Sequence, residues 1–300
     1  MRKTAIVGVA AIVLLAAGAV VYLNVLRGNV ALALVPDPWT STASIHSDLL
    51  NRDMAIEVFR PPADESCSLQ PVLFLFHGSG SDQRQWMEGD FGTGVGIDAI
   101  AHRLIDSGRI TLVTIVSAMI DKSYGVDSPP STDTWTHGPY ESYIVEELIP
   151  GVEARYSVGG TAAERSVGGL SMGGFAALNA ALRHPDLFSS VGALSPAFFV
   201  SPPADRAWIY AGGDGRHDPL SLADEGSADH QRVFLGYGDR DYNWIRGATS
   251  ELANRLTARG NSVEPVVVSG SHDVATWRQL AEPMLLDLFA RDGSAAGSGC

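Results

Sequence analysis

The first residue whose type and setting could do chemistry is a serine between glycines. Gly169-Leu170-Ser171-Met172-Gly173 fits the pattern G-x-S-x-G, with a short apolar run before it and a small-residue helical pattern after it. On a tight strand-to-helix turn, Cβ atoms two residues either side of the serine would collide with the backbone, which explains the glycines. Such a turn exposes the hydroxyl and lets the Met172 N–H face a developing oxyanion. We predict that Ser171 is a nucleophile; the alternative is an ordinary glycine-rich turn.

A serine hydroxyl needs a base to take its proton, and the usual base is a histidine. Of the eight histidines, His272 lies in Ser269-Gly270-Ser271-His272-Asp273, directly after the last predicted strand. In an open α/β sheet the loops at the carboxyl ends of the strands gather at one edge. We therefore predict His272 as the base; the alternative is a surface-loop histidine.

The acid that orients the histidine should follow the preceding strand, where two carboxylates stand two residues apart, Asp239 and Asp241. Asp241 lies three residues beyond Gly238, which leaves room for a turn back toward His272. We favour Asp241 and keep Asp239 as the alternative. The carboxylate that is not used is expected to be a solvated turn residue or a brace for the loop.

A second oxyanion donor is expected in the loop after an early strand. His77-Gly78-Ser79-Gly80 follows the apolar run Val72–Phe76 and fits that position. We predict the backbone N–H groups of Ser79 and Met172 as the oxyanion hole, with Gly78 as the alternative to Ser79, and His77 as a prop for the loop. A phosphate-cradling loop is excluded because the G-K-[ST] signature is absent.

Two tryptophans are candidates for shaping a substrate pocket, Trp86 after the oxyanion loop and Trp135 in the long 117–139 loop. Packing is the alternative for each, and Trp277 is expected in the core beneath the histidine loop. No metal site is predicted, because the adjacent pairs His217-Asp218 and His272-Asp273 would diverge. The predicted chemistry requires no cofactor, and two cysteines, Cys67 and Cys300, cannot form a disulfide framework.

The elements that must position these residues alternate between strand-like and helix-like patterns, which is typical of an α/β domain with a mostly parallel sheet and helices on both faces. We predict one domain over 37–291, a flexible tail over 292–300, and a functional loop or lid over 201–231. Pro150 should kink or split the helix that contains it. Glu141, Glu146 and Glu147 are expected on the outer face of that helix. The predicted strands are Met54–Phe59, Val72–Phe76, Ile110–Val116, Ser166–Leu170, Ser190–Leu194, Val233–Tyr237 and Val263–Val268, and the predicted helices are Ile97–Ile105, Tyr140–Arg155, Gly174–Arg183, Ala248–Arg259 and Thr276–Phe289.

The N-terminal segment, residues 1–36, has a different character. Ala5–Leu23 contains no charged residue and lies between Lys3 and Arg27. As a helix it would be about 28 Å long, close to the roughly 30 Å hydrocarbon core of a bilayer, whereas the apolar region of a secretory signal usually spans only about 7–15 residues. We predict a membrane anchor or uncleaved signal; the alternative is a signal cleaved after Ala31-Leu32-Ala33. Both imply an extracytoplasmic protein.

Charge excludes several classes of partner. The formal net charge of the 300 residues is −13, and because the first 36 residues carry +3, the rest carries −16. An acidic domain with a sequence pI near 4.9 is not attracted to nucleic acid or to an anionic bilayer, so neither is predicted as its main partner. Contact with a membrane is expected only through the N-terminal helix, if it is uncleaved.

Several motifs, taken together, resemble the esterase branch of the α/β-hydrolases that contains S-formylglutathione hydrolases, feruloyl and acetylxylan esterases and mycolyltransferases. The resemblance covers roughly residues 50–290 and implies the α/β-hydrolase fold. It carries over Ser171, His272 and an aspartate at 241 (or 239) as a triad, with the Met172 N–H in the oxyanion hole. The matching segments are Glu164–Phe188, His77 to Trp86, Tyr143–Tyr156, Asp218-Pro219-Leu220, and Gly270 to Trp277.

The function expected from the sequence is therefore an exported serine esterase that acts on a small-molecule or glycan ester through an acyl-enzyme. Two other functions remain open: an acyltransferase of the mycolyltransferase type, with the same triad, and a catalytically silent hydrolase-fold binding module. The acyl and alcohol specificity and the oligomeric state are not predicted.

Overall fold

The computed structural model describes residues 37–62, 70–87, 93–211 and 217–291. The predicted N-terminal anchor, the predicted tail and both cysteines lie outside the described residues. Within the described ranges, no helix has the length and apolar character needed to cross a bilayer.

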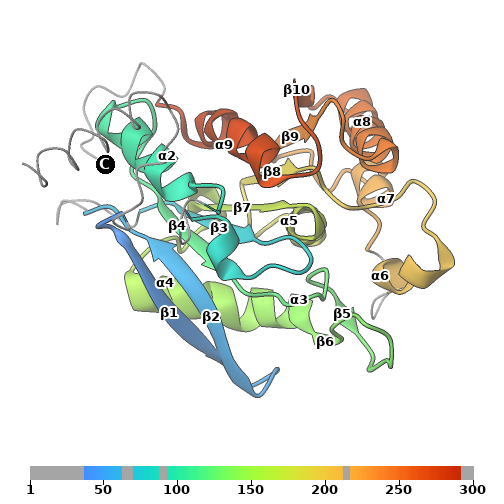
Figure 1. Cartoon of the computed structure of the whole chain (residues 1–300), viewed down its shortest axis with the longest axis horizontal. Coiled ribbons are helices and arrows are strands. Elements are labelled where there is room, and N and C mark those ends of the chain that lie inside the picture. The colour runs from blue at the N-terminus through green and yellow to red at the C-terminus, as the bar shows by residue number, and fades with distance from the viewer. Residues whose placement is uncertain (1–36, 63–69, 88–92, 212–216, 292–300) are drawn as a thin grey trace, which may run out of the picture.

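A central sheet of eight strands has the order β1-β2-β4-β3-β7-β8-β9-β10. β1 and β2 pair antiparallel and form one edge, and β2 also runs antiparallel to β4. The six strands from β4 to β10 in this order are all parallel, which confirms the predicted mostly parallel sheet (Figure 1). The strands are β1 Thr40–Ser47, β2 Arg52–Phe59, β3 Val72–Phe76, β4 Thr114–Ala118, β7 Arg165–Leu170, β8 Ser190–Leu194, β9 Arg232–Gly238 and β10 Val266–Val268; the short pair β5 Asp127–Ser128 and β6 Gly138–Pro139 forms a second sheet.

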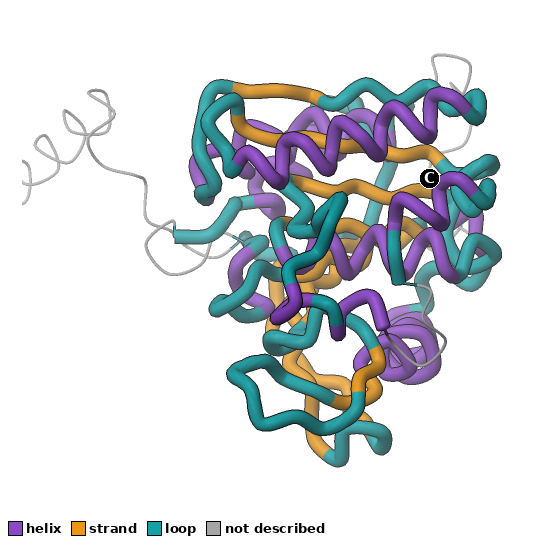
Figure 2. Tube along the Cα trace, turned by 90° about the vertical axis from the view of Figure 1, so that its right-hand side faces the viewer, coloured by secondary structure: helices purple, strands orange, loops and turns teal. Residues whose placement is uncertain are grey.

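Helices cover both faces of the central sheet (Figure 2). Successive side chains of a strand point to opposite faces, so Phe74 of β3 joins one hydrophobic cluster while Leu73 and Leu75 join the other. The Phe74 cluster includes residues of α4 Ile149–Tyr156, α5 Met172–Arg183, α7 Pro219–Asp224 and α8 Asn243–Ala258; the other includes residues of α2 Ile97–Asp106 and α9 Val274–Phe289.

Most predicted strands are present, although some of their bounds differ and one strand was not predicted. The strand predicted over Val263–Val268 forms only over Val266–Val268 (β10). β3 and β8 have the predicted bounds, but the strand predicted over Ile110–Val116 begins only at Thr114. Ile110 instead forms a bridge with Ala290, outside the main sheet. β1 was not predicted, because its sequence is mostly polar and it lies at the edge of the sheet, where one side can face water.

The helix predicted over Tyr140–Arg155 is split, as Pro150 suggested. It consists of α3 Tyr140–Ser142, a π-helix over Tyr143–Leu148, and α4, in which Pro150 is in the first turn. Proline lacks an N–H and is tolerated in a first turn, and the wider π turn before it marks the break.

The predicted loop over 201–231 contains local structure. It includes a 3₁₀ turn at Ala204–Arg206, the short helix α6 Trp208–Ala211, and α7. Tyr210 ties this insertion to the end of the β8 loop, because its hydroxyl accepts a hydrogen bond of 2.7 Å from the Phe199 N–H. A lid function for the insertion remains a prediction.

Candidate active site

The turn that carries Ser171 joins β7 directly to α5. Ser171 has φ 53° and ψ −118°, a backbone conformation that residues with a Cβ seldom adopt. A Cβ atom at Gly169 would lie 2.0 Å from the Gly173 carbonyl oxygen, and one at Gly173 would lie 2.1 Å from the Phe76 carbonyl oxygen. Both flanking glycines are therefore required by the close approach of the backbone, as the sequence pattern suggested.

The structure brings Ser171, Asp241 and His272 together. Nε2 of His272 lies 2.9 Å from the Ser171 hydroxyl oxygen, and its Nδ1 lies 2.9 Å from Oδ1 of Asp241. The three residues follow β7, β9 and β10, whose carboxyl ends meet at one edge of the parallel sheet. With Asp241 as acceptor, the Nδ1–H tautomer is favoured, and Nε2 is left to accept the serine proton.

Asp241 is buried, yet its neighbours favour the ionised form. Burial raises its pKa, but the hydrogen bond with His272 and the hydroxyl of nearby Ser195 lower the pKa by more, so that it lies below its ordinary value. The Tyr242 N–H also donates to Oδ1, at 2.7 Å. In the described part of the chain, Oδ2 lacks a partner of normal hydrogen-bond geometry. Ser195 itself has φ 48° and accepts a 3.1 Å hydrogen bond from the Trp277 indole.

Asp239, the alternative acid, holds the backbone of the histidine loop. Its Oδ1 accepts a hydrogen bond of 2.9 Å from the Gly270 N–H, and its own N–H donates to the Val268 carbonyl oxygen at 2.8 Å. The side chain is about half exposed and also pairs with Arg240 at 3.3 Å. These contacts correspond to the role of loop brace.

The loop after β3 lies against the nucleophile. A Cβ atom at Gly78 would be 3.5 Å from the Ser171 Cβ, so the loop backbone borders the hydroxyl. The Gly78 N–H already donates to Gln85 Oε1 at 2.7 Å, which disfavours it as an oxyanion donor. Among the described residues, no acceptor is found for the Ser79 N–H, and Met172 is the first residue of α5, where N–H groups lack intrahelical acceptors.

His77 braces this loop from inside the core. Its Nδ1 donates to the Gly78 carbonyl oxygen at 2.9 Å, while Nε2 accepts from the Ile120 N–H at 3.1 Å. Burial lowers the pKa of His77, so the neutral form is favoured. Both ring nitrogens are used in joining two loops, which suits a prop and not a base.

The tryptophans have different surroundings. Trp86 has no exposed surface, and its indole N–H donates to the Phe76 carbonyl oxygen at 2.8 Å. Its position therefore agrees with the packing alternative and not with a place in the substrate pocket. Trp135 is half-buried, contacts Tyr124 and Trp208, and lies under the Arg206 guanidinium at 4.5 Å. Trp277 lies edge-on to His272, with ring centroids 5.1 Å apart, in the expected core position.

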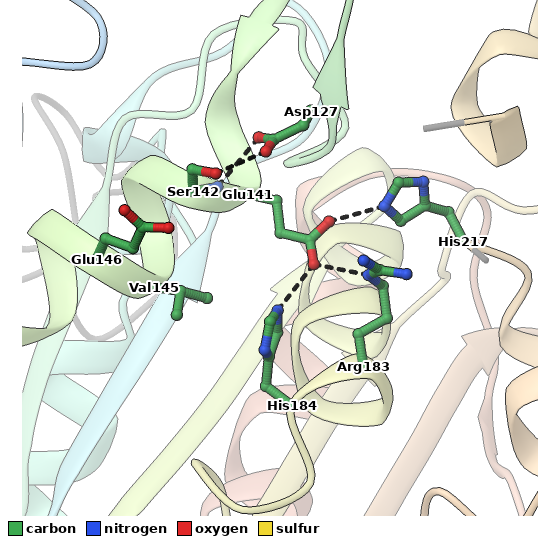
Figure 3. A pocket seen from close by; sticks show the side chains of 8 residues that line it. All are labelled: Asp127, Glu141, Ser142, Val145, Glu146, Arg183, His184 and His217. Atoms are coloured by element: carbon green, nitrogen blue, oxygen red, sulfur yellow. Dashed lines mark hydrogen bonds and ion pairs between the residues drawn. The ribbon is translucent and has the colours of Figure 1, made fainter. Parts of the chain in front are cut away.

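A buried ionic cluster away from Ser171 was not predicted (Figure 3). Glu141, expected on an outer helix face, is only 6% exposed. Its carboxylate accepts hydrogen bonds from Arg183 at 2.6 Å, His184 at 2.8 Å and His217 at 2.7 Å, beside a cavity of about 270 Å³. Burial raises its pKa, but these three donors lower it far more, well below the usual range. The sequence pattern failed here because the three partners come from a distant helix end and from the insertion.

Comparison with known proteins agrees with this architecture. The family model described as Putative esterase matches residues 47–288. The chain belongs to this esterase family. The match includes every strand of the central sheet except β1, together with the turn at Ser171 and the histidine loop.

Individual relatives have related names. An endo-1,4-beta-xylanase/feruloyl esterase of Xylanibacter ruminicola is 27% identical over 224 residues, which are 73% of this chain and 26% of that protein. An esterase of Mycobacterium tuberculosis is 32% identical over 126 residues, 42% of this chain and 25% of that protein. The chain thus spans about a quarter of the length of these curated relatives.

Solved structures share the fold. A ferulic acid esterase superposes with a TM-score of 0.70 at 24% identity and covers 83% of this chain and 97% of its own. An S-formylglutathione hydrolase of Staphylococcus aureus has a TM-score of 0.64 at 18% identity, over 83% of this chain and 98% of its own. A ferulic acid esterase of Anaeromyces mucronatus, in complex with ferulic acid, has a TM-score of 0.63 at 22% identity, over 86% of this chain and 93% of its own.

Proposed function

We propose that this chain is a serine esterase in which Ser171 is the nucleophile, His272 the general base and acid, and Asp241 the orienting acid. The observation that carries the proposal is the position of the His272 ring, hydrogen-bonded at 2.9 Å both to the Ser171 hydroxyl and to Asp241. Membership of the esterase family and the strained turn at Ser171 support it further.

In the first half of the reaction, Ser171 Oγ attacks the ester carbonyl carbon while His272 Nε2 takes the hydroxyl proton. The negative charge moves to the carbonyl oxygen, which the N–H groups of Met172 and Ser79 stabilise. When the intermediate collapses, the ester C–O bond breaks, and His272 gives its proton to the departing alcohol. Asp241 stabilises the imidazolium throughout and stays ionised because its pKa is lowered.

In the second half, water takes the place of the alcohol. His272 accepts a proton from the water as its oxygen attacks the acyl-enzyme carbonyl, and then returns that proton to Ser171 Oγ as the acyl–serine bond breaks. The products are a carboxylic acid and an alcohol, and no electron acceptor or cofactor takes part. An acyltransferase would differ only in the acceptor hydroxyl, and the relatives' names favour hydrolysis.

Aromatic acyl esters such as methyl ferulate are the first substrates to test, because relatives in both comparisons are named feruloyl or ferulic acid esterases. The test compares wild type with Ser171→Ala on p-nitrophenyl acetate and methyl ferulate. Wild type should hydrolyse at least one of them, and the variant should lose about 10⁴-fold or more in kcat. Undiminished turnover by the variant would refute the role of Ser171, and a folded, inactive wild type would favour the silent binding module.

The domain assignment and the location are also part of the proposal. We infer a catalytic domain over 37–291 that is held outside the cytoplasm by an N-terminal helix within residues 1–36, with 292–300 as a tail. The charge pattern of the sequence and the uncharged run Ala5–Leu23 support this arrangement.

A further inference from the structure

Ser195 is a buried serine with an unusual backbone conformation. It directly follows β8, has no exposed surface, and has φ 48°, a value that residues with a Cβ seldom adopt. Such conformations cost free energy and persist only where the surrounding structure imposes them, often at functional sites. Ser195 is therefore a candidate for a role in the reaction.

Backbone hydrogen bonds join the turn at Ser195 to the nucleophile and to β9. Leu194, the residue before it, accepts a hydrogen bond of 2.9 Å from the Ser171 N–H, and Ala197 donates to the Ser171 carbonyl oxygen at 2.8 Å. The Ser195 N–H donates to the Gly236 carbonyl oxygen at 2.7 Å. Ser195 is thus fixed both to the turn that carries the nucleophile and to the strand that leads to the acid.

The Ser195 hydroxyl has a proton to donate, and Asp241 has an oxygen that lacks a donor. Oγ of Ser195 accepts the Trp277 indole N–H at 3.1 Å, and in the described part of the chain no other partner of normal geometry contacts it. Oδ2 of Asp241 is buried and likewise has no such partner there, although Ser195 lies close enough to lower the Asp241 pKa. Because unpaired buried polar groups are costly, we expect the two groups to satisfy each other.

The Trp277 indole sets the direction of the Ser195 proton. An indole N–H can only donate, so it occupies a lone pair of Ser195 Oγ and leaves the hydroxyl proton to point elsewhere. The same indole lies edge-on to His272, with ring centroids 5.1 Å apart at 87°. One side chain therefore contacts the base directly and the acid through Ser195.

Resting on the proposed function, we propose that Ser195 and Trp277 are positioning residues for the acid of the triad. The Ser195 hydroxyl donates to Oδ2 of Asp241, while Oδ1 accepts from His272 Nδ1 at 2.9 Å. With a donor on each oxygen, the carboxylate cannot rotate away from the imidazole, and its charge is stabilised in a buried site. The hydroxyl takes no part in making or breaking bonds and acts only through Asp241.

The other charged side chains of the loops and helices around Asp241 make their hydrogen bonds to different groups. They are Asp239, Arg240, Arg246 and Asp273, whose partners include the Gly270 N–H, Ser269, the Asp239 carbonyl oxygen and the Thr276 N–H. Among the described residues, His272 is the ionisable side chain that contacts the Asp241 carboxylate, so the two titrate as a pair. All these charges stay the same in a Ser195 variant, so a changed pH dependence reports the hydroxyl.

Two variants that remove the hydroxyl separate its role from that of the backbone. Ser195→Ala keeps a Cβ at φ 48°, whereas Ser195→Gly accepts this φ without strain. On the ester that wild type hydrolyses best, both should lower kcat about tenfold, change KM by less than about twofold, and move the acid limb of kcat/KM upward by about 0.5–1 pH unit. The limb moves upward because a carboxylate that has lost a donor is protonated at a higher pH.

Ser190→Ala is the control, because it removes a buried hydroxyl from the other end of the same strand. Ser190 contacts the Ser166 hydroxyl at 2.7 Å, so this variant should lower the melting temperature and leave the acid limb in place. Trp277→Phe removes the indole N–H and should move the limb upward by less than Ser195→Ala. The double variant should show only the shift of Ser195→Ala, because the indole acts through the hydroxyl.

An acid limb that stays in place in Ser195→Ala, or that moves as far in Ser190→Ala, would overturn the proposal. A shift in Ser195→Ala but not in Ser195→Gly would assign the effect to the backbone and overturn it as well, and additive shifts in the double variant would remove Trp277 from it. Failure of the esterase function looks different, because folded wild type would then hydrolyse no ester. In that case, carbon NMR of the Asp241 carboxyl group, assigned with Asp241→Asn, decides: titration at a higher pH in Ser195→Ala supports the hydrogen bond, and unchanged titration overturns it.

Discussion

Among single residues, the two aspartates after β9 differ in what they contact, and therefore in the roles expected of them. Asp241 contacts His272 Nδ1, whereas Asp239 holds the Gly270 N–H and is half exposed. The sequence alone left both aspartates as candidates for the acid. The direction of the four-residue loop between β9 and α8 depends on hydrogen bonds that a sequence pattern does not show. Tyr242 and Ser195 were also missed as neighbours of the acid, although each directly follows a residue or strand that the sequence did identify.

The first prediction follows from that difference. Asp241→Asn should lower kcat by about 10⁴-fold, because the amide favours the wrong imidazole tautomer and cannot stabilise the imidazolium. Asp239→Asn keeps an oxygen acceptor for Gly270 and should cost less than tenfold. Steady-state rates on p-nitrophenyl acetate give both values, and the reverse order would hand the acid role to Asp239.

The backbones of two elements come close together where α5 passes β3. A Cβ at Gly173 would meet the Phe76 backbone, which has no room to move within the central strand. Gly173→Ala should therefore lower the free energy of unfolding by about 3 kcal/mol and remove most activity. The matched control is Gly247→Ala in α8, where a Cβ meets nothing within 4 Å. This alanine should raise the free energy of unfolding by about 0.5–1 kcal/mol. Denaturant unfolding measures both, and similar values for the two variants would contradict the crowding argument.

The Glu141 cluster links three elements, α3, the end of α5 and the insertion through His217. Glu141→Gln should cost about 3 kcal/mol of unfolding free energy, because it leaves Arg183 with a buried neutral partner. Glu282→Gln is the control, since its partners Arg103 and Arg109 are about half exposed and the pairs should be worth less than about 1 kcal/mol. Equal costs for the two variants would contradict the structural importance of the cluster.

The same cluster makes a pH prediction. The pKa of Glu141 is lowered on folding, so its contribution to stability is complete above its ordinary value of 4.5 and is lost as the pH falls below it. The melting temperature of wild type should therefore decline more steeply below pH 4.5 than that of Glu141→Gln. Parallel declines would indicate that Glu141 titrates normally.

The strands were predicted best where apolar runs are continuous. They were predicted least well where contacts with distant parts of the chain determine the structure. β3 and β8 are buried on both faces, so their sequences alone mark their ends. The predicted strand at Ile110 began too early because Ile110 is apolar for another reason: outside the strand, its side chain is fully buried in the hydrophobic cluster that contains Leu73 and Leu75. Glu141 was placed on the wrong face because its partners, Arg183, His184 and His217, lie far along the chain, and the period of one helix does not record such contacts.

For the whole molecule, the sequence predicted the architecture and the edge of the sheet at which the site lies. Ser171 and His272 are 101 residues apart in the chain, and parallel strand ends bring them within 2.9 Å. The exposure of Tyr242 and Trp244 could not be predicted in this way, because the sequence does not show which tyrosines and tryptophans remain exposed. The uneven charge of the chain still supports an anchored acidic domain.

The proposed N-terminal anchor leads to a prediction for the whole molecule. The full chain expressed in its host should be found in the membrane fraction and should resist extraction by high salt, because the attachment is an apolar helix and not a surface charge. Mass spectrometry of the recovered protein should find residues N-terminal to Leu34. A soluble product beginning near Leu34 would show a cleaved signal instead.

The central claim is that the Ser171 hydroxyl is activated by His272. The most direct measurement is labelling with a fluorophosphonate, followed by tandem mass spectrometry of the modified peptide. One adduct on Ser171 is expected in wild type, with labelling slowed at least about 10³-fold in His272→Ala while circular dichroism stays native. An adduct at another residue, no adduct on folded wild type, or equally fast labelling of His272→Ala would contradict the claim.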